Sequence, residues 1–323
     1  MRAIAAFAAS RTQTVNPTDH RLRFLRRLAL LCAVMVLAVI SLSAYLRLSK
    51  AGLGCADWPQ CYGQSLRQLQ QGVGLSADEQ TATAAARLVH RIVAVIALLL
   101  VIMMVMVCWG SKPLLRREGA LAVALLVLAL FLAVLGRWSS SARVPAVTMG
   151  NLLGGFAMLA LCARLALAGQ APRAPRRRGW VIVALVLLLA QVALGGLVSA
   201  SFAGLSCSSA WVECAQAASG VGWETLNPWR EPVLAASPPV NPAGALAQAL
   251  HRGLALVLAL LSVPLAIAAW REGRPRVGAA LWVLLALQVA IGLLMTQASL
   301  PLALALLHNL LGAGLLAALV LLI

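Results

Sequence analysis

The chain has 323 residues, of which 62% are hydrophobic and 11% are charged. This composition excludes an ordinary soluble domain and is typical of a polytopic membrane protein. The net charge of +17 would suggest nucleic acid in a soluble protein, but here most basic residues fall in short loops between apolar runs, where they report topology. With only 2 Tyr and 5 Phe, no basic and aromatic patch is visible, so we expect no nucleic-acid partner.

The basic residues 1–24 are expected to form a cytoplasmic tail, in which His20 is a solvated side chain. No cleavable signal peptide is expected, because the first apolar run is longer than the ~7–15 residues of a signal's hydrophobic core. Eight apolar runs follow, each long enough to cross a bilayer, for which ~20 residues are needed. They cover residues 25–46, 85–109, 118–138, 146–168, 180–202, 245–270, 277–297 and 302–322.

The loops between these runs predict the orientation of the chain. Those after the second, fourth and sixth runs are basic, so the positive-inside rule places them and both termini in the cytoplasm. The long loops 47–84 and 203–244 then face outward, and each holds one close pair of cysteines. An oxidising compartment favours a disulfide in each loop. The paired residues are Cys55 and Cys61, and Cys207 and Cys214. The other cysteines, Cys32, Cys108 and Cys162, are expected to be small core residues.

An internal repeat runs through the chain. The segment Ala-Gly-Leu-Gly-Cys at 51–55 corresponds to Ala-Gly-Leu-Ser-Cys at 203–207. The segment Asn-Leu-Leu-Gly at 151–154 recurs at 309–312. The pairs His90-Arg91 and His251-Arg252 also correspond. The repeat predicts an all-α membrane protein of two tandem four-helix bundles related by a pseudo-two-fold axis. The bundles cover residues 25–170 and 171–323 and are joined by a segment rich in Pro and Arg.

Three histidines lie inside apolar runs, where an imidazole is costly to bury and a functional role is the default hypothesis. His90, His251 and His308 each fall about two turns, roughly 9 Å, inside the outer end of a run. His251 and His308 lie at matching depth, as the two ligands of a six-coordinate haem iron would. Zinc is disfavoured because it usually takes more N, S or O ligands than this half offers. The alternative is that each histidine hydrogen-bonds a neighbouring helix.

Residues 52–61, Gly-Leu-Gly-Cys-Ala-Asp-Trp-Pro-Gln-Cys, together with the two His-Arg helices, the final histidine helix and the cysteine loops, resemble the haem A synthase family of bacteria and mitochondria. The similarity spans essentially the whole membrane region. It implies a membrane oxidoreductase that converts haem O to haem A, for cytochrome oxidase, by successive hydroxylations of a ring methyl to a formyl group. It also implies the bacterial inner membrane, with the cysteine loops periplasmic. Haem O synthase, cytochrome oxidase assembly proteins and a second copy of the chain are the expected partners.

The resemblance also implies roles for individual residues. His251 and His308 would hold a cofactor haem b through its iron, with Arg252 as a further binding residue. His90 would be the catalytic residue and would bind the iron of the substrate haem O, with Arg91 and Asn151 beside it. Arg91 and Arg252 would meet haem propionates, or else would anchor the helix ends.

The chain departs from the family in two places. Many members carry a glutamate where this chain has Arg87, and many have a second histidine on the fourth helix, where this chain reads Thr-Met-Gly-Asn-Leu at 148–152. His90 is therefore the one evident histidine ligand for the substrate. Met149 is expected to be ordinary packing. Asp57 is the nearest matched carboxylate, unless it simply caps a turn.

Three alternatives remain open. A membrane thiol-disulfide oxidoreductase would use the outward cysteines, but it leaves the histidine pattern unexplained, and neither loop contains Cys-x-x-Cys. A non-catalytic haem-binding or assembly homologue would account for Arg87 and for the missing histidine. A duplicated transporter would be expected to contain broken helices or a charged path near the membrane midplane.

Overall fold

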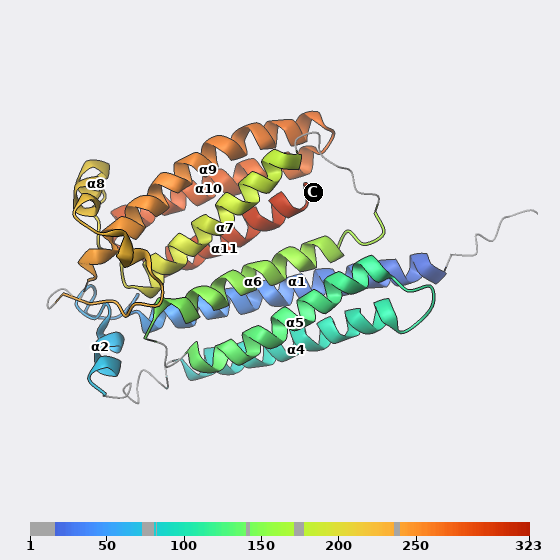
Figure 1. Cartoon of the computed structure of the whole chain (residues 1–323), viewed down its shortest axis with the longest axis horizontal. Coiled ribbons are helices and arrows are strands. Elements are labelled where there is room, and N and C mark those ends of the chain that lie inside the picture. Colours follow the sequence, from blue (N-terminus) through green and yellow to red (C-terminus); the bar gives the residue numbers. More distant parts are fainter. Residues whose placement is uncertain (1–16, 73–80, 82, 140–142, 171–177, 236–239) are drawn as a thin grey trace, which may run out of the picture.

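The computed structural model describes residues 17–72, 81, 83–139, 143–170, 178–235 and 240–323, and all regular structure in these ranges is helical (Figure 1). Eight helices are long and apolar enough to cross a membrane, which confirms the eight predicted spans. They are α1 (Pro17–Lys50), α4 (Ala84–Trp109), α5 (Arg116–Ser139), α6 (Pro145–Leu165), α7 (Arg178–Ala200), α9 (Ala245–Arg271), α10 (Pro275–Gln297) and α11 (Leu302–Val320).

The described parts of the two long loops contain short helices. The first loop holds α2 (Gln64–Gln70), and the second holds α8 (Trp211–Ser219) and the 3-10 turns η1 (Trp223–Leu226) and η2 (Pro242–Gly244). Figure 1 shows α2 and α8 at the same end of the long helices. The two loops that carry the cysteine pairs therefore share one end of the molecule.

The first helix is longer than its apolar run, which corrects the expected boundary of the tail. Helix α1 begins at Pro17, so residues 17–24 belong to the helix and not to a separate tail. Its basic side chains bind carbonyl oxygens near the ends of other helices. Arg21 donates to the carbonyl oxygens of Val107 at 2.6 Å and Pro113 at 2.9 Å, and Arg26 donates to that of Ala168 at 2.6 Å. Cations are favoured at such helix ends, so these contacts extend the helix beyond its lipid-soluble part.

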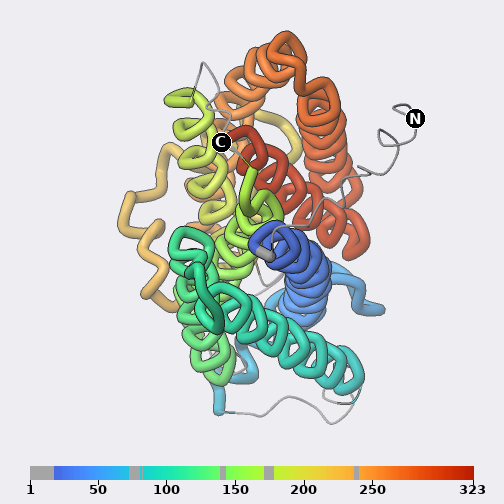
Figure 2. Tube along the Cα trace, turned by 90° about the vertical axis from the view of Figure 1, so that its right-hand side faces the viewer, coloured from blue at the N-terminus to red at the C-terminus, as the bar shows by residue number. Residues whose placement is uncertain are grey.

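The long helices form two closed rings, which Figure 2 shows nearly end-on. In the first ring, α1 contacts α4 and α6, and α5 contacts α4 and α6. In the second ring, α9 contacts α7 and α10, and α11 contacts α10 and α7. Helices α1 and α6 also pack on α11, and α6 packs on α7, so the rings share a long seam. The predicted two-fold relation between the rings stays a prediction.

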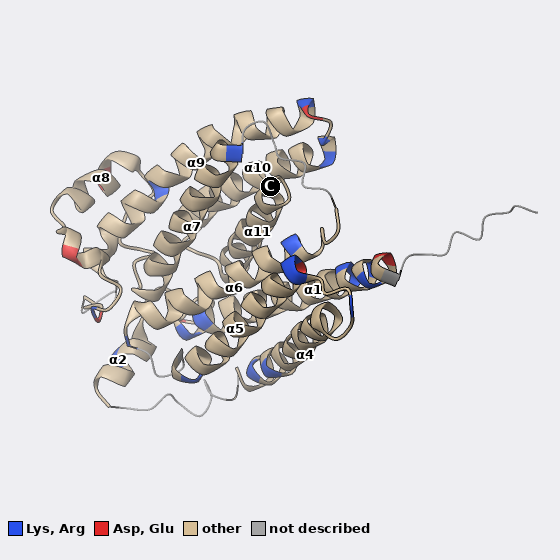
Figure 3. Ribbon diagram, turned by 45° about the vertical axis from the view of Figure 1, so that its right-hand side comes forward, with Lys and Arg blue, Asp and Glu red and all other residues tan. Residues whose placement is uncertain are grey.

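The positions of the charged residues and of the glycines are those expected of helices that span a membrane. Lys and Arg lie toward the ends of the long helices in Figure 3. Glycines allow close approach where helices cross. A Cβ at Gly278 of α10 would lie 2.7 Å from the carbonyl oxygen of Ala266 in α9. Helix α9, which carries His251, is therefore closely packed against α10.

A second, smaller core joins the two long loops. Its buried centre is Tyr62, whose ring lies edge-on to Trp58 at 5.3 Å and to Phe202 at 5.8 Å. The Gly204 N–H donates to the Tyr62 hydroxyl at 3.2 Å, and burial raises the pKa of Tyr62 to about 12. Gly52 has φ +98°, and a Cβ there would lie 2.7 Å from a carbonyl oxygen, so this turn requires glycine. The turn brings the chain at Gly52 close to Cys61 within the first loop.

Candidate functional site

Helices α9 and α11 bring His251 and His308 together. Their ring centres lie 6.4 Å apart, and the ring planes are inclined at 65°. Two imidazoles that each bind one iron through a nitrogen at about 2 Å have ring centres roughly 6 Å apart. The separation therefore fits a single iron between the rings. The Nδ1 atom of His308 is buried without a hydrogen-bond partner, as a nitrogen available to a ligand would be.

Each of these histidines lies beside a glutamine from the neighbouring helix. His251 Nδ1 lies 3.2 Å from the main-chain oxygen of Gln191 in α7, and His251 Nε2 lies 3.4 Å from the Gln191 amide nitrogen. His308 Nε2 lies 3.1 Å from the amide nitrogen of Gln288 in α10. The side-chain oxygens of both glutamines are buried and have no partner among the described residues. The sequence reasoning missed both glutamines.

Arg252 follows His251 and reaches the second loop. Its guanidinium donates to the carbonyl oxygen of Ser208 at 2.8 Å, which ties α9 to the loop of the second cysteine pair. Its Nε is buried and lacks a partner among the described residues. The contact supports the anchoring role, while the unpaired Nε leaves one donor available to an anion.

In the first ring, His90 of α4 faces α1. The Ser43 hydroxyl lies 2.9 Å from His90 Nε2. Arg47 comes one turn after Ser43 on the same face of α1, and its Nε is buried with no partner among the described residues. Arg91 is exposed. Arg87 turns back and donates to the Thr83 hydroxyl.

The fourth helix of the first ring places glycine where the second ring has a histidine. Gly150 precedes Asn151 as His308 precedes Asn309, and a Cβ at Gly150 would lie 2.9 Å from Leu135 of α5. Met149 lies against Gly196 of α7, so it packs in the seam between the rings, as expected of a packing residue. Asn151 is partly buried on α6, and within the described ranges no hydrogen bond joins it to His90.

The structure joins Cys55 to Cys61 and Cys207 to Cys214, with Cα atoms 6.6 and 4.7 Å apart. The first loop reaches the second ring, because a Cβ at Gly54 would lie 3.5 Å from Leu302 at the start of α11. The three remaining cysteines are buried and unpaired in the described part of the chain, which confirms them as core residues. Asp57 lies in a turn, where the Gln60 N–H donates to its carbonyl oxygen at 2.8 Å.

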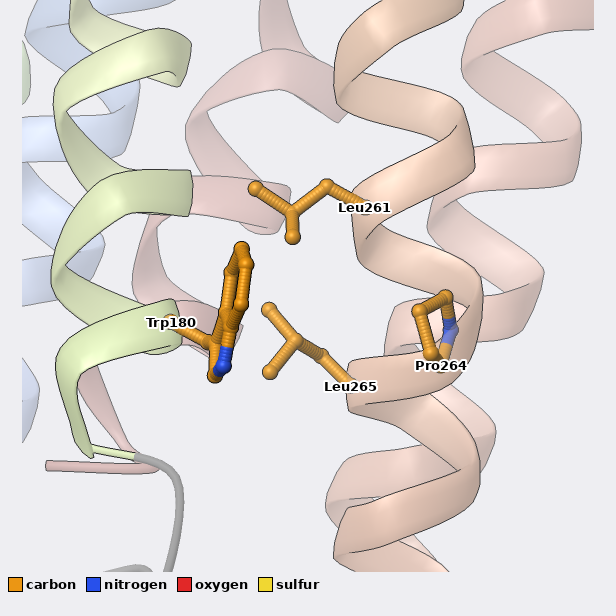
Figure 4. A pocket seen from close by; sticks show the side chains of 4 residues that line it. All are labelled: Trp180, Leu261, Pro264 and Leu265. Atoms are coloured by element: carbon orange, nitrogen blue, oxygen red, sulfur yellow. The ribbon is translucent and has the colours of Figure 1, made fainter.

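A separate apolar cavity of about 440 Å³ lies between α7 and α9 (Figure 4). Its lining residues are Trp180, Leu261, Pro264 and Leu265. Leu261 comes ten residues after His251, which is about 15 Å along the helix. The cavity therefore lies well away from the imidazoles and offers no ligand for a metal.

Two residues near His90 also escaped the sequence reasoning. Ser43 lies near the end of an apolar run, and Arg47 comes directly after that run as the first residue of a long loop, so neither was singled out. Zinc finds no further support, since no group of three or more His, Cys, Asp or Glu is arranged for a metal ion in the ranges that the structure describes.

The chain is also similar to known proteins. The family model described as cytochrome oxidase assembly protein matches residues 26–320. A relative named Heme A synthase, from Shewanella oneidensis (strain MR-1), is 32% identical over 195 residues. That match covers 54% of this chain and 57% of the relative, so the chain spans little more than half the length of the curated relative that it matches.

Proposed function

The chain belongs to the family of cytochrome oxidase assembly proteins, and from that premise we propose that it is a haem A synthase. The reaction oxidises a ring methyl of haem O to a formyl group by successive hydroxylations. The last hydroxylation gives a geminal diol, which loses water. The observation that carries the proposal is the pair His251 and His308, with ring centres 6.4 Å apart in a chain that the family matches almost from end to end.

The second ring is proposed to hold haem b as its cofactor. His251 and His308 would be the axial ligands, because their spacing fits one iron and His308 Nδ1 has no partner among the described residues. When bound, the haem supplies one-electron transfer. Arg252 would place its unpaired Nε toward a haem propionate while its other end stays on the loop.

The first ring is proposed to bind the substrate, haem O. His90 would meet the substrate iron, and the Ser43 hydroxyl would hold the imidazole ring. Arg47, one turn toward the outer end, would bind a propionate carboxylate, because its Nε is buried without a partner among the described residues and such a donor is costly without an anion. Arg91 adds a second positive charge at this end of α4, and Asn151 is a further proposed substrate contact.

We also infer how the chain lies in the bacterial inner membrane. Both termini would be cytoplasmic and both cysteine loops periplasmic, as the basic loops favour. The two bundles, residues 25–170 and 171–323, would be related by a pseudo-two-fold axis. The two closed helix rings support this division. Haem O synthase, cytochrome oxidase assembly proteins and a second copy of the chain are the proposed partners.

A second candidate is a haem-binding assembly protein without catalysis. Two observations favour it: Arg87 stands where many relatives have a carboxylate and donates to the Thr83 hydroxyl, and Gly150 stands where the second ring has His308. A thiol-disulfide oxidoreductase is favoured less, because it gives no role to the paired imidazoles of His251 and His308 and neither loop contains Cys-x-x-Cys.

One experiment separates these functions. The full chain is co-expressed with a haem O synthase and purified, and the extracted haems are identified by mass. Haem A together with haem B supports the synthase. Haem B with unconverted haem O supports the assembly protein, provided that a family member of known activity makes haem A in the same host.

A further inference from the structure

A five-residue segment occurs twice in the second ring, once beside each histidine. Gln-Val-Ala-Leu-Gly covers residues 191–195 of α7, and Gln-Val-Ala-Ile-Gly covers residues 288–292 of α10. In each segment the glutamine and the glycine are four residues apart and share one face of the helix. Helix α7 packs on α9, which carries His251, and α10 packs on α11, which carries His308. The repeat thus presents the same two residues to two different imidazoles.

Gln191 determines which nitrogen of His251 carries the proton. Nδ1 lies 3.2 Å from the main-chain oxygen of Gln191, and a carbonyl oxygen can only accept. The proton therefore sits on Nδ1, which leaves the lone pair on Nε2. The Gln191 amide also donates to the main-chain oxygen of His251 at 3.0 Å. Gln191 thus fixes both the tautomer of the ring and the position of the turn that bears it.

Gln288 stands in the same relation to His308, through its side chain. Its amide nitrogen lies 3.1 Å from Nε2, while its oxygen is buried with no partner among the described residues. The two ends of an amide exchange by a half turn, which would offer that oxygen to a ring N–H. A metal-bound imidazole keeps one N–H that needs an acceptor, and Gln288 supplies that acceptor within reach of the ring.

The glycines explain how the rings come so close to the neighbouring helix. A Cβ at Gly195 would lie 2.9 Å from Cε1 of His251, and a Cβ at Gly292 would lie 3.3 Å from Cε1 of His308. In a regular helix the side chain at 195 also lies over the carbonyl of residue 191. Glycine therefore keeps that carbonyl open to the imidazole, in addition to making room for the ring.

We propose that Gln191 with Gly195, and Gln288 with Gly292, are the positioning residues of the two haem ligands, each pair holding one ring nitrogen and leaving the other for iron. This inference rests on the proposed function, since it takes the bound group to be haem b. By raising the basicity of the ligands, the acceptors favour ferric over ferrous iron. The glutamines thus tune the potential at which the cofactor gives and takes its electron.

The test uses Gln288→Leu and Gln288→Glu in the purified full chain, with haem titration and the midpoint potential of the bound haem as readouts. The leucine variant should bind haem about 10- to 100-fold more weakly, as when the partner of a metal-bound histidine is removed. The glutamate variant should keep the haem, and its stronger acceptor should favour ferric iron about tenfold, a potential about 59 mV lower.

Gln248 provides the matched control. It is buried on α9, one turn before His251, but its amide donates to the carbonyl oxygen of Gly204 at 3.0 Å and not to an imidazole. Gln248→Leu and Gln248→Glu should change the potential by much less than the Gln288 pair. Equal shifts at both positions would overturn the inference and leave the proposed function standing. A parent protein that binds no haem b would overturn both.

Discussion

The substitution Gly195→Ala should strengthen helix α7 and weaken the haem site at the same time. Alanine in a helix interior is favoured over glycine by roughly 0.5–1 kcal/mol. The added Cβ would lie 2.9 Å from His251 Cε1, whereas carbon atoms in good contact are about 3.5 Å apart or more. The ring must therefore retreat by about 0.6 Å.

That retreat breaks the hydrogen bond that orients the ligand. The Nδ1–oxygen distance to Gln191 grows from 3.2 Å to about 3.8 Å, beyond hydrogen-bond range. Loss of such a bond weakens metal binding by about 10- to 100-fold. This loss corresponds to about 1.4–2.8 kcal/mol of binding free energy.

The assay combines haem titration of the purified apoprotein with its thermal unfolding in the same detergent. Gly253→Ala is the control, because no atom lies within 4 Å of a Cβ at that position of α9. Both variants should unfold at or above the temperature of the parent, and only Gly195→Ala should lose haem affinity. A Gly195→Ala protein that binds haem within twofold of the parent would refute the reasoning.

Three further predictions concern the other parts of the site. The His308→Ala variant should lose the tightly bound haem b, whereas the His90→Ala variant should keep haem b and make no haem A. The haems extracted from each variant test both outcomes. A full content of low-spin haem in the His308→Ala variant would contradict the assignment of His308 as a ligand. Arg47→Met removes the buried cation and should weaken haem O binding about tenfold or more, in line with the loss of a charged hydrogen bond; unchanged binding in a titration would count against the propionate contact. Burial raises the pKa of Tyr62 from ~10 in the unfolded chain to about 12 in the folded protein. The stability that the buried, neutral side chain provides should therefore be fully present below pH ~10. It should be lost as the pH rises through the folded pKa, as expected when folding raises a pKa. Tyr62→Phe should remove that pH dependence in chemical unfolding.

The helices were predictable from the sequence because a membrane span must be long and apolar and must satisfy its own backbone. The matching depth of His251 and His308 followed from their places in two such runs. The start of α1 was missed because Arg21 was assigned to a solvated tail, whereas its guanidinium group binds carbonyl oxygens of Val107 and Pro113. A count of charges cannot reveal such long-range acceptors.

The glutamines were missed for a different reason. Gln191 and Gln288 each stand alone in an apolar run, and hydropathy gives no sign of which helix face meets which neighbour. Their repeat is visible in the sequence, but its meaning depends on the pairing of α7 with α9 and of α10 with α11. Arg47 was missed likewise, since its place one turn from Ser43 matters only once Ser43 is seen to contact His90.

The two long loops are joined by hydrogen bonds at one end of the molecule. The hydroxyl of Tyr62 accepts from Gly204, Arg67 donates to the carbonyl oxygen of Ala235, and Gln70 donates to Glu231. Together with the helix seam, these contacts join the two halves. The packing of the two rings therefore determines how far His90 lies from the other two histidines. In the proposed reaction, electrons would pass between two halves of one chain that are already in contact, so no docking of separate proteins would be needed.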